Sequence, residues 1–243
     1  MQFSLKHAQL NMVESLSDKP RRHKVLSYVN GLHNPRPDFF VVGFSGSKGM
    51  KADRGIMGHT TDYSLRGALM STVVVKGGHL PKRGEAHKFV LGVDGSERSK
   101  LAADRILALA GAEDTVILLH VFSSASEADI GTKFRAPAVK DFFKDYAGDD
   151  DRCSYVELDC SGDGKHSLAD SLVDFALESE ADFLAVGCDG VGSYTAGKKE
   201  TALGSFSDRV VKMAQVSVVV VQNRDATYSE TAEEADAGKV AHK

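Results

Sequence analysis

The chain has 243 residues, 42% hydrophobic and 26% charged, the proportions of a soluble globular protein with one large domain or two small ones. Its formal net charge of −4 offers no concentrated basic face for nucleic acid, and its longest apolar run, residues 216–221, is too short to span a membrane. Three cysteines without C-x-x-C spacing favour a reducing, cytoplasmic compartment and argue against a disulfide framework or a structural metal site.

The first part of the chain, residues 1–78, ends in a strand–helix–strand pattern. FSLKHAQL at 3–10 is interpreted as a strand and HKVLSYVNGLH at 23–33 as a helix. PDFFVVGFSG at 37–46 predicts a strand, and residues 58–77 predict a helix followed by a strand rich in valine.

After a linker at 79–86, residues 87–222 alternate five predicted strands with helices. The strands are expected at 88–94, 115–122, 153–160, 182–187 and 217–222, and the later helices near 135–147, 166–179 and 205–214. Because parallel neighbours need crossover connections, this pattern predicts an α/β fold, a three-layer αβα sandwich around a five-stranded parallel sheet. The remaining residues, 223–243, have few large apolar side chains and are predicted to be a disordered tail.

The two parts of the chain repeat each other. PDFFVVGFSG resembles ADFLAVGCDG at 181–190, and residues 58–77 resemble residues 204–223 at an offset of 146. Residues 1–78 are therefore interpreted as a truncated second copy of the last part of the 87–222 domain. Because this copy lacks the central strands, we expect either the end of a longer tandem protein or a fragment that docks on the complete copy.

The segment between Gly187 and Asp208 contains a near-match to a phosphate-binding loop. GSYTAGKK at 192–199 resembles the P-loop G-x-x-x-x-G-K-[ST], but Lys199 stands where a hydroxyl would bind Mg²⁺. The next helix is predicted to start at Gly204-Ser205, so the near-match lies in the middle of a connection. The P-loop interpretation is therefore rejected.

The two ends of the same segment suit phosphate binding better. Gly187 and Gly190 follow a strand, and Gly204-Ser205 opens a helix. Glycine allows close backbone approach, and a helix N-terminus presents amide groups with the positive end of the helix dipole. Ligands of parallel sheets bind at this carboxyl edge, so these residues are candidates for a phosphate cradle.

The whole arrangement resembles the universal stress protein family in its ATP-binding form. The family pattern is a strand ending in Asp, a strand ending in His-Val, and then G-x2-G-x9-G-[ST] before the last helix and strand. Here these features match VDGS at 93–96, His120-Val121, and Gly187–Gly190 with Gly204-Ser205. The resemblance covers residues 87–222 in full and about 20–78 as a partial copy.

The resemblance implies a role for each matching residue. Asp94 would hold the ribose or adenine end of ATP beside Gly92 and Val93, and Val121 would line the adenine pocket. The residues that would approach the ribose and phosphates are Gly187, Gly190, Gly204, Ser205 and Phe206. AMP is a further candidate ligand, and ATP is expected with or without Mg²⁺.

Structural interpretations stay open beside these roles. Asp94 could be a turn residue next to Gly95, and Gly204-Ser205 a plain helix cap. His120 is interpreted as a core or strand-end residue, and Cys188 as unreactive. The spacer at 191–203 has 13 residues where the family has nine, which leaves open whether this longer lid closes over a nucleotide.

The leading hypothesis is a cytoplasmic, stress-response module whose ATP occupancy is linked to dimerisation or partner binding. The alternatives are a dimerising scaffold that binds no nucleotide and, less favoured, a slow ATP hydrolase or adenylyl-transfer enzyme; no catalytic residue is assigned. The resemblance also implies pairing through the last strands. Residues 73–75 and 218–221 are therefore predicted to be neighbouring edge strands, in a homodimer or an intramolecular pseudo-dimer.

Overall fold

The computed structural model describes residues 21–31, 37–45, 57–77, 84–124, 136–161, 167–188 and 203–222. The strand predicted at 3–10 and the tail predicted at 223–243 lie outside these residues, as does most of the linker at 79–86. Within the described part of the chain, no helix is long and apolar enough to span a bilayer.

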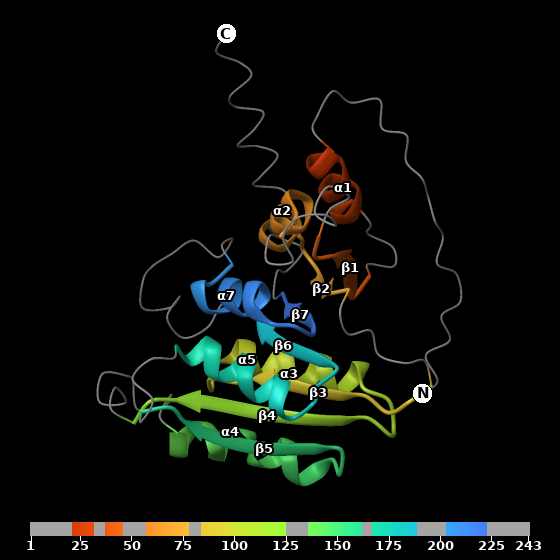
Figure 1. Cartoon of the computed structure of the whole chain (residues 1–243). Helices are drawn as coiled ribbons and strands as arrows, with labels where there is room; N and C mark the ends of the chain where they lie inside the picture. Colours follow the sequence, from red (N-terminus) through yellow and green to blue (C-terminus); the bar gives the residue numbers. More distant parts are fainter. Residues whose placement is uncertain are drawn as a thin grey trace.

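The elements follow the predicted alternation along the chain (Figure 1). The first four are α1 (Arg21–Asn30), β1 (Phe39–Gly43), α2 (His59–Gly67) and β2 (Ser71–Val75). The others are β3 (Lys88–Gly92), α3 (Glu97–Leu109), β4 (Thr115–Phe122), α4 (Ala136–Asp149), β5 (Cys153–Asp159), α5 (Leu168–Glu178), β6 (Phe183–Gly187), α7 (Ser205–Met213) and β7 (Ser217–Val221).

The strands form one mixed sheet of seven strands in the order β1-β2-β7-β6-β3-β4-β5. Strands β3 to β7 pair in parallel, as expected. The sheet as a whole is nevertheless not the expected five-stranded parallel one, because β2 pairs antiparallel with β7 and β1 pairs parallel with β2. The valine-rich edge of β7 is thus covered by a second valine-rich strand of the same chain.

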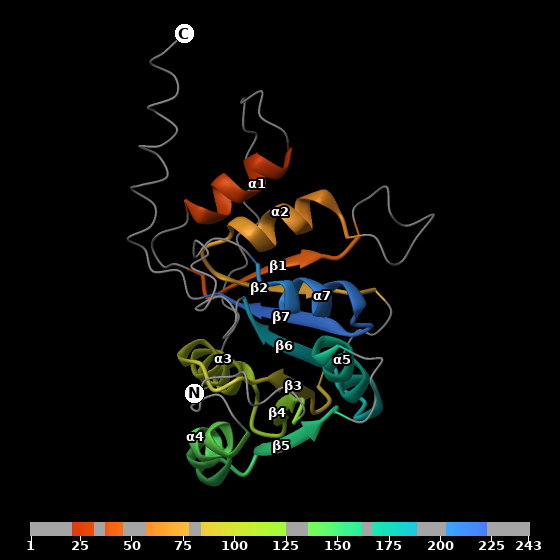
Figure 2. The ribbon, with the colours of Figure 1, turned by 90° about the vertical axis from the view of Figure 1, so that its left-hand side faces the viewer.

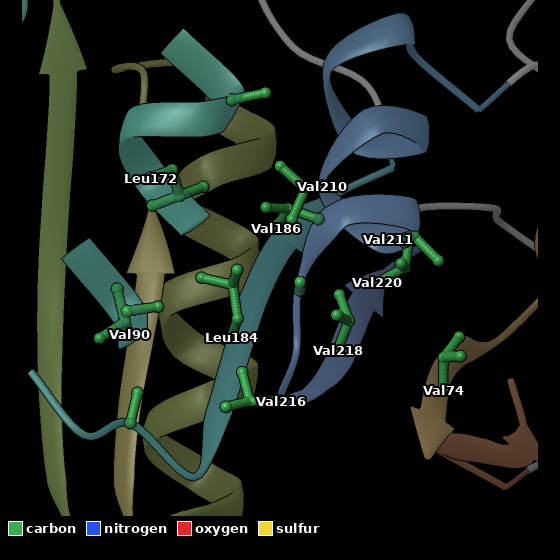
Figure 3. Close-up of a cluster of buried hydrophobic side chains, with 14 of the residues drawn as sticks. Val74, Val90, Leu172, Leu184, Val186, Val210, Val211, Val216, Val218 and Val220 are labelled. Atoms are coloured by element: carbon green, nitrogen blue, oxygen red, sulfur yellow. The ribbon is translucent and has the colours of Figure 1, made fainter. Parts of the chain in front are cut away.

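Helices cover both faces of the β3–β7 part of the sheet (Figure 2). Helices α3 and α4 pack over one face with a core that includes Leu91, Ile106 and Phe143. Helices α5 and α7 pack over the other, and Figure 3 shows Leu172 and Val210 in this second core. Val74 of β2 belongs to the same cluster, so the core continues across the β2–β7 junction.

The register of β2 against β7 matches the sequence repeat. Val73 lies opposite Val219, and these two positions are 146 residues apart. On either side Thr72 pairs with Val220 and Val74 with Val218. The predicted neighbouring placement of these strands is confirmed, although both are interior strands of the seven-stranded sheet and not its edges.

Backbone hydrogen bonds also correspond between the two halves of this junction. The Phe44 amide donates to the Val75 carbonyl at 2.9 Å, and the Cys188 amide donates to the Val221 carbonyl at 2.9 Å. The helices that follow begin alike, with Gly58 N bound to Phe44 O and Gly204 N bound to Cys188 O, both at 2.8 Å. The described parts of residues 39–75 and 183–221 thus share the order strand, helix, strand and these connecting hydrogen bonds.

Candidate functional site

The order of strands reverses between β3 and β6. From β3 the chain proceeds through β4 to β5 on one side, and β6 and β7 then lie on the other side of β3. Connections leave neighbouring carboxyl ends in opposite directions at such a point and open a crevice there. The predicted site residues that the structure describes lie at this carboxyl edge.

At the end of β3 the chain packs closely against α5. A Cβ on Gly92 would lie 2.9 Å from Cδ2 of Leu172, a side chain that is fully buried. Val93 is buried, and its amide donates to the Leu119 carbonyl at 3.0 Å. The structure therefore gives Gly92 a packing role and fixes the backbone that leads into Asp94.

Asp94 begins a tight turn into α3. Its Oδ1 accepts hydrogen bonds from the Ser96 amide at 3.1 Å and the Ser96 hydroxyl at 2.6 Å. Ser96 in turn caps α3 by accepting from the Ser99 amide, and Gly95 has a φ of 76°, which favours glycine. The turn interpretation of Asp94 is thus realised, and its carboxylate stays at the carboxyl end of β3.

Two hydrogen bonds hold the start of α7 against the end of β6. The Ser207 hydroxyl donates to the Gly187 carbonyl at 2.7 Å, and Gly204 N donates to the Cys188 carbonyl at 2.8 Å. No side chain caps this helix at Gly204. The amides of Ser205 and Phe206, in its first turn, have no partner within the helix. They lie at the positive end of the helix dipole.

The carboxyl end of β4 contributes Val121 and its neighbours. Val121 is half-buried and packs against the core on the α5 and α7 side. His120 is buried and stacks on Phe122 with ring centroids 5.3 Å apart. These positions match the interpretation of His120 as a core histidine.

Two predicted features lie outside the described residues: Gly190 and the long spacer as far as residue 202. The predicted residues that the structure places together at the carboxyl edge are Gly92, Val93, Asp94, Val121, Gly187, Gly204, Ser205 and Phe206. Among the described residues there is no group of three or more metal-ligating side chains.

Arg98 is a candidate that the sequence interpretation missed. It lies in the first turn of α3, and its Nη1 is 3.9 Å from Sγ of Cys188, the residue after β6. A cationic side chain therefore lies near the strand end where Gly187 and the α7 N-terminus meet. The available sequence signal was an arginine four residues after Asp94.

This combination, a doubly wound sheet with glycines and a helix N-terminus at its switch point, defines a class of α/β domains suited to bind a small ligand. The family model described as "Universal stress protein family" matches residues 85–222. The chain belongs to the universal stress protein family, which confirms the family predicted from the sequence; the ATP-binding form and the partial copy in residues 1–78 stay predictions.

Solved structures show the same fold at low sequence identity. A protein of unknown function from Pseudomonas aeruginosa PAO1 matches with a TM-score of 0.58 and 14% identity, over 90% of this chain and 74% of that one. A putative universal stress protein from P. aeruginosa UCBPP-PA14 gives 0.57 and 14%, over 89% and 74%. A universal stress protein from Archaeoglobus fulgidus DSM 4304 gives 0.58 and 14%, over 84% and 66%. A search of curated proteins finds no match.

Proposed function

We propose that this chain is a cytoplasmic universal stress protein that binds ATP, or a related adenine nucleotide such as AMP, at the carboxyl edge of β3, β4 and β6. One observation carries the proposal: Gly204 and the first turn of α7 are held directly against the end of β6, at the point where the strand order reverses. The match of VDGS at 93–96 and of the glycine pattern at 187–204 to the ATP-binding form of the family supports the same ligand class.

Five of the described residues have a proposed task. The Asp94 carboxylate accepts hydrogen bonds from the ribose or adenine end, and Val121 borders the base. The amides of Ser205 and Phe206 bind phosphate oxygens, because orphan amides and the helix dipole favour an anion. Arg98 adds positive charge near the end of β6. Mg²⁺, where it accompanies ATP, would be bound mainly by phosphate oxygens, water and at most one or two carboxylates.

The N-terminal part is proposed to be a partial copy of the family fold that occupies the dimerisation edge of the complete domain. The antiparallel register supports this, because a twofold axis places a residue opposite its own equivalent, as Val73 lies opposite Val219. The resulting pseudo-dimer is intramolecular.

Calorimetric titration of the full chain with ATP tests the proposal, after native mass spectrometry has shown whether nucleotide copurifies. Gly204→Val is expected to abolish binding, because a side chain fills the space next to the amides. The φ of Gly204, −61°, is ordinary for any residue, so the fold should survive. Unchanged ATP affinity in this variant would reject the phosphate site.

Asp94 needs a variant that separates its two roles. Asp94→Asn keeps a side-chain oxygen for the turn bonds to Ser96 but removes the charge, whereas Asp94→Ala removes both. Both variants are expected to lose ATP affinity. If Asp94→Asn binds like the wild type and only Asp94→Ala is impaired, Asp94 acts as a turn residue alone.

A scaffold without nucleotide is the second candidate, favoured by the β2–β7 pairing itself, which joins the two parts of the chain through backbone pairing and a shared valine-rich core. An enzyme is less favoured. His120 is buried against Phe122 and Cys188 is buried, so neither is presented as an exposed base or nucleophile. We propose at most slow ATP hydrolysis. Absence of ATP binding in the full chain would favour the scaffold.

A further inference from the structure

Helix α7 is contacted at its C-terminal end by Lys76, the residue that follows β2. Lys76 Nζ donates to the carbonyl of Ala214 at 2.5 Å and to that of Lys212 at 3.3 Å. The same ammonium group lies 4.0 Å from the centroid of the Phe44 ring. A buried lysine of the N-terminal part thus caps the helix whose other end belongs to the proposed nucleotide site.

A second contact reaches the first turn of α7. Arg66 of α2 donates through Nη2 to Oδ1 of Asp208 at 2.8 Å, while Lys212 of α7 binds Oδ2 of the same carboxylate at 2.5 Å. Asp208 lies in the first turn of α7, beside the amides proposed to bind phosphate. Arg66 therefore offsets a negative charge that would otherwise repel an anionic ligand.

The capping is reciprocal. Gln222, which follows β7, donates through Nε2 to the carbonyl of Leu65 near the end of α2 at 3.0 Å. Gln222 and Lys76 are both buried and occupy equivalent positions after their strands. Each part of the chain thus holds the last helix of the other, and a shift of α7 cannot leave the N-terminal contacts unchanged.

We infer that the N-terminal part regulates the nucleotide site through α7, with Lys76 and Arg66 as positioning residues. This inference rests on the proposed function for its ligand. A nine-residue helix is about 13 Å long and moves as a rigid unit, so capping at one end constrains the amides at the other. By linkage, nucleotide must stabilise the contacts of the N-terminal part by the same factor by which those contacts raise nucleotide affinity.

The first test measures ATP affinity of the full chain by calorimetry. Lys76→Met and Arg66→Ala are each expected to lower the affinity about five- to tenfold. Arg66→Lys is expected to retain most of it, because a cation remains beside Asp208. Asp62→Ala is the matched control, since it removes the other ion pair of Arg66, at 3.0 Å within α2, and leaves the pair with Asp208 intact.

The second test needs no ligand. Hydrogen exchange of the Asp208 amide, which donates to Gly204 O at 2.9 Å, is expected to be faster in Lys76→Met than in the wild type or Asp62→Ala. Exchange and affinity that are unchanged in Lys76→Met and Arg66→Ala would overturn the inference while leaving ATP binding intact. If the wild type binds no ATP but Asp208 exchange is still faster in Lys76→Met, the coupling along α7 stands and the proposed function is rejected instead.

In the wild type, added ATP is expected to slow exchange of the β2 amides, and Lys76→Met is expected to lose most of this effect. A purely structural role for Lys76 would change the basal exchange without changing the response to ATP. An equal ATP response in both proteins would therefore overturn the inference.

Discussion

Val73 and Val219 face each other across β2 and β7, and they are the same position of the sequence repeat, 146 residues apart. A residue that pairs with its own equivalent marks the local symmetry axis of an antiparallel junction. The pairs on either side exchange partners across that axis, Thr72 with Val220 and Val74 with Val218. The junction between the two parts therefore has the geometry of a twofold interface built into one chain.

Two buried serines accept hydrogen bonds at this junction. Replacing each by alanine should lower the free energy of unfolding by a different amount. Ser217 Oγ accepts the Lys76 amide at 3.4 Å, and Ser71 Oγ accepts the Gln222 amide at 3.3 Å and also Arg105 Nη1 at 3.0 Å. Each Ser→Ala change leaves a buried amide unsatisfied, a cost of about 1–3 kcal/mol, and Ser71→Ala should cost more.

Urea denaturation of the two serine variants measures the difference, with the exposed Ser27→Ala as a control that should stay within about 0.5 kcal/mol of the wild type. Equal losses for Ser71→Ala and Ser217→Ala would mean that the Arg105 contact contributes nothing to stability.

Gly92 is required by packing. Gly92→Ala brings a methyl group against Leu172, which is fully buried and cannot move aside freely, so a loss of about 1–3 kcal/mol is expected. Gly148→Ala in α4 is the contrasting control, because its Cβ would meet nothing within 4 Å. That change should stabilise the protein by up to about 1 kcal/mol, since alanine favours a helix more than glycine does.

Thermal and urea unfolding of the two glycine variants check the signs. A Gly92→Ala variant as stable as the wild type would show that α5 can shift to accept the methyl group.

The order of elements was predictable from the sequence because local patterns specify it. The strands predicted at 115–122 and 153–160 are found at Thr115–Phe122 and Cys153–Asp159, where continuous apolar or β-prone runs leave little choice. The positions of Arg98 and Lys76 were not predictable. A charged residue in a first helical turn or after a strand is normally solvated, and only the tertiary contacts with Cys188 and α7 give these two their surroundings.

The repeat was visible in the sequence, yet it left the shape of the sheet undetermined. A strand–helix–strand segment of this kind can complete a sheet, dock elsewhere or await a partner, and the valine-rich pattern of β2 suits each outcome. The packing of Val74 with Val218 and Val220 determines that β2 extends the sheet beside β7. That cluster forms only when residues about 146 apart in the sequence meet.

Asp150 should contribute to stability above about pH 4. The guanidinium of Arg152 donates to its carboxylate at 2.9 and 2.6 Å and lowers the pKa of Asp150 from 3.8 to about 2. Between these values the unfolded chain binds more protons than the folded one, so the free energy of unfolding falls as the pH drops from 4 to 2. Asp150→Asn should lose less stability over that interval, as measured by urea midpoints at pH 5 and pH 3; parallel curves would contradict the assignment.

Lys76 should also make stability rise with pH, but in the alkaline range and through the cost of burying its charge. Burial lowers its pKa from 10.5 to about 8, so between these values the unfolded chain holds a proton that the folded chain has released. The free energy of unfolding should therefore rise with pH across this interval, by at most about 1.4 kcal/mol per pH unit.

In Lys76→Met this contribution is absent. The stability of the wild type relative to Lys76→Met should increase between pH 7.5 and 9.5 in guanidinium titrations, because the cost of burying the ammonium is relieved as it deprotonates. A constant difference would show that the contacts with the Ala214 carbonyl and the Phe44 ring keep Lys76 charged throughout, with its pKa near the ordinary value.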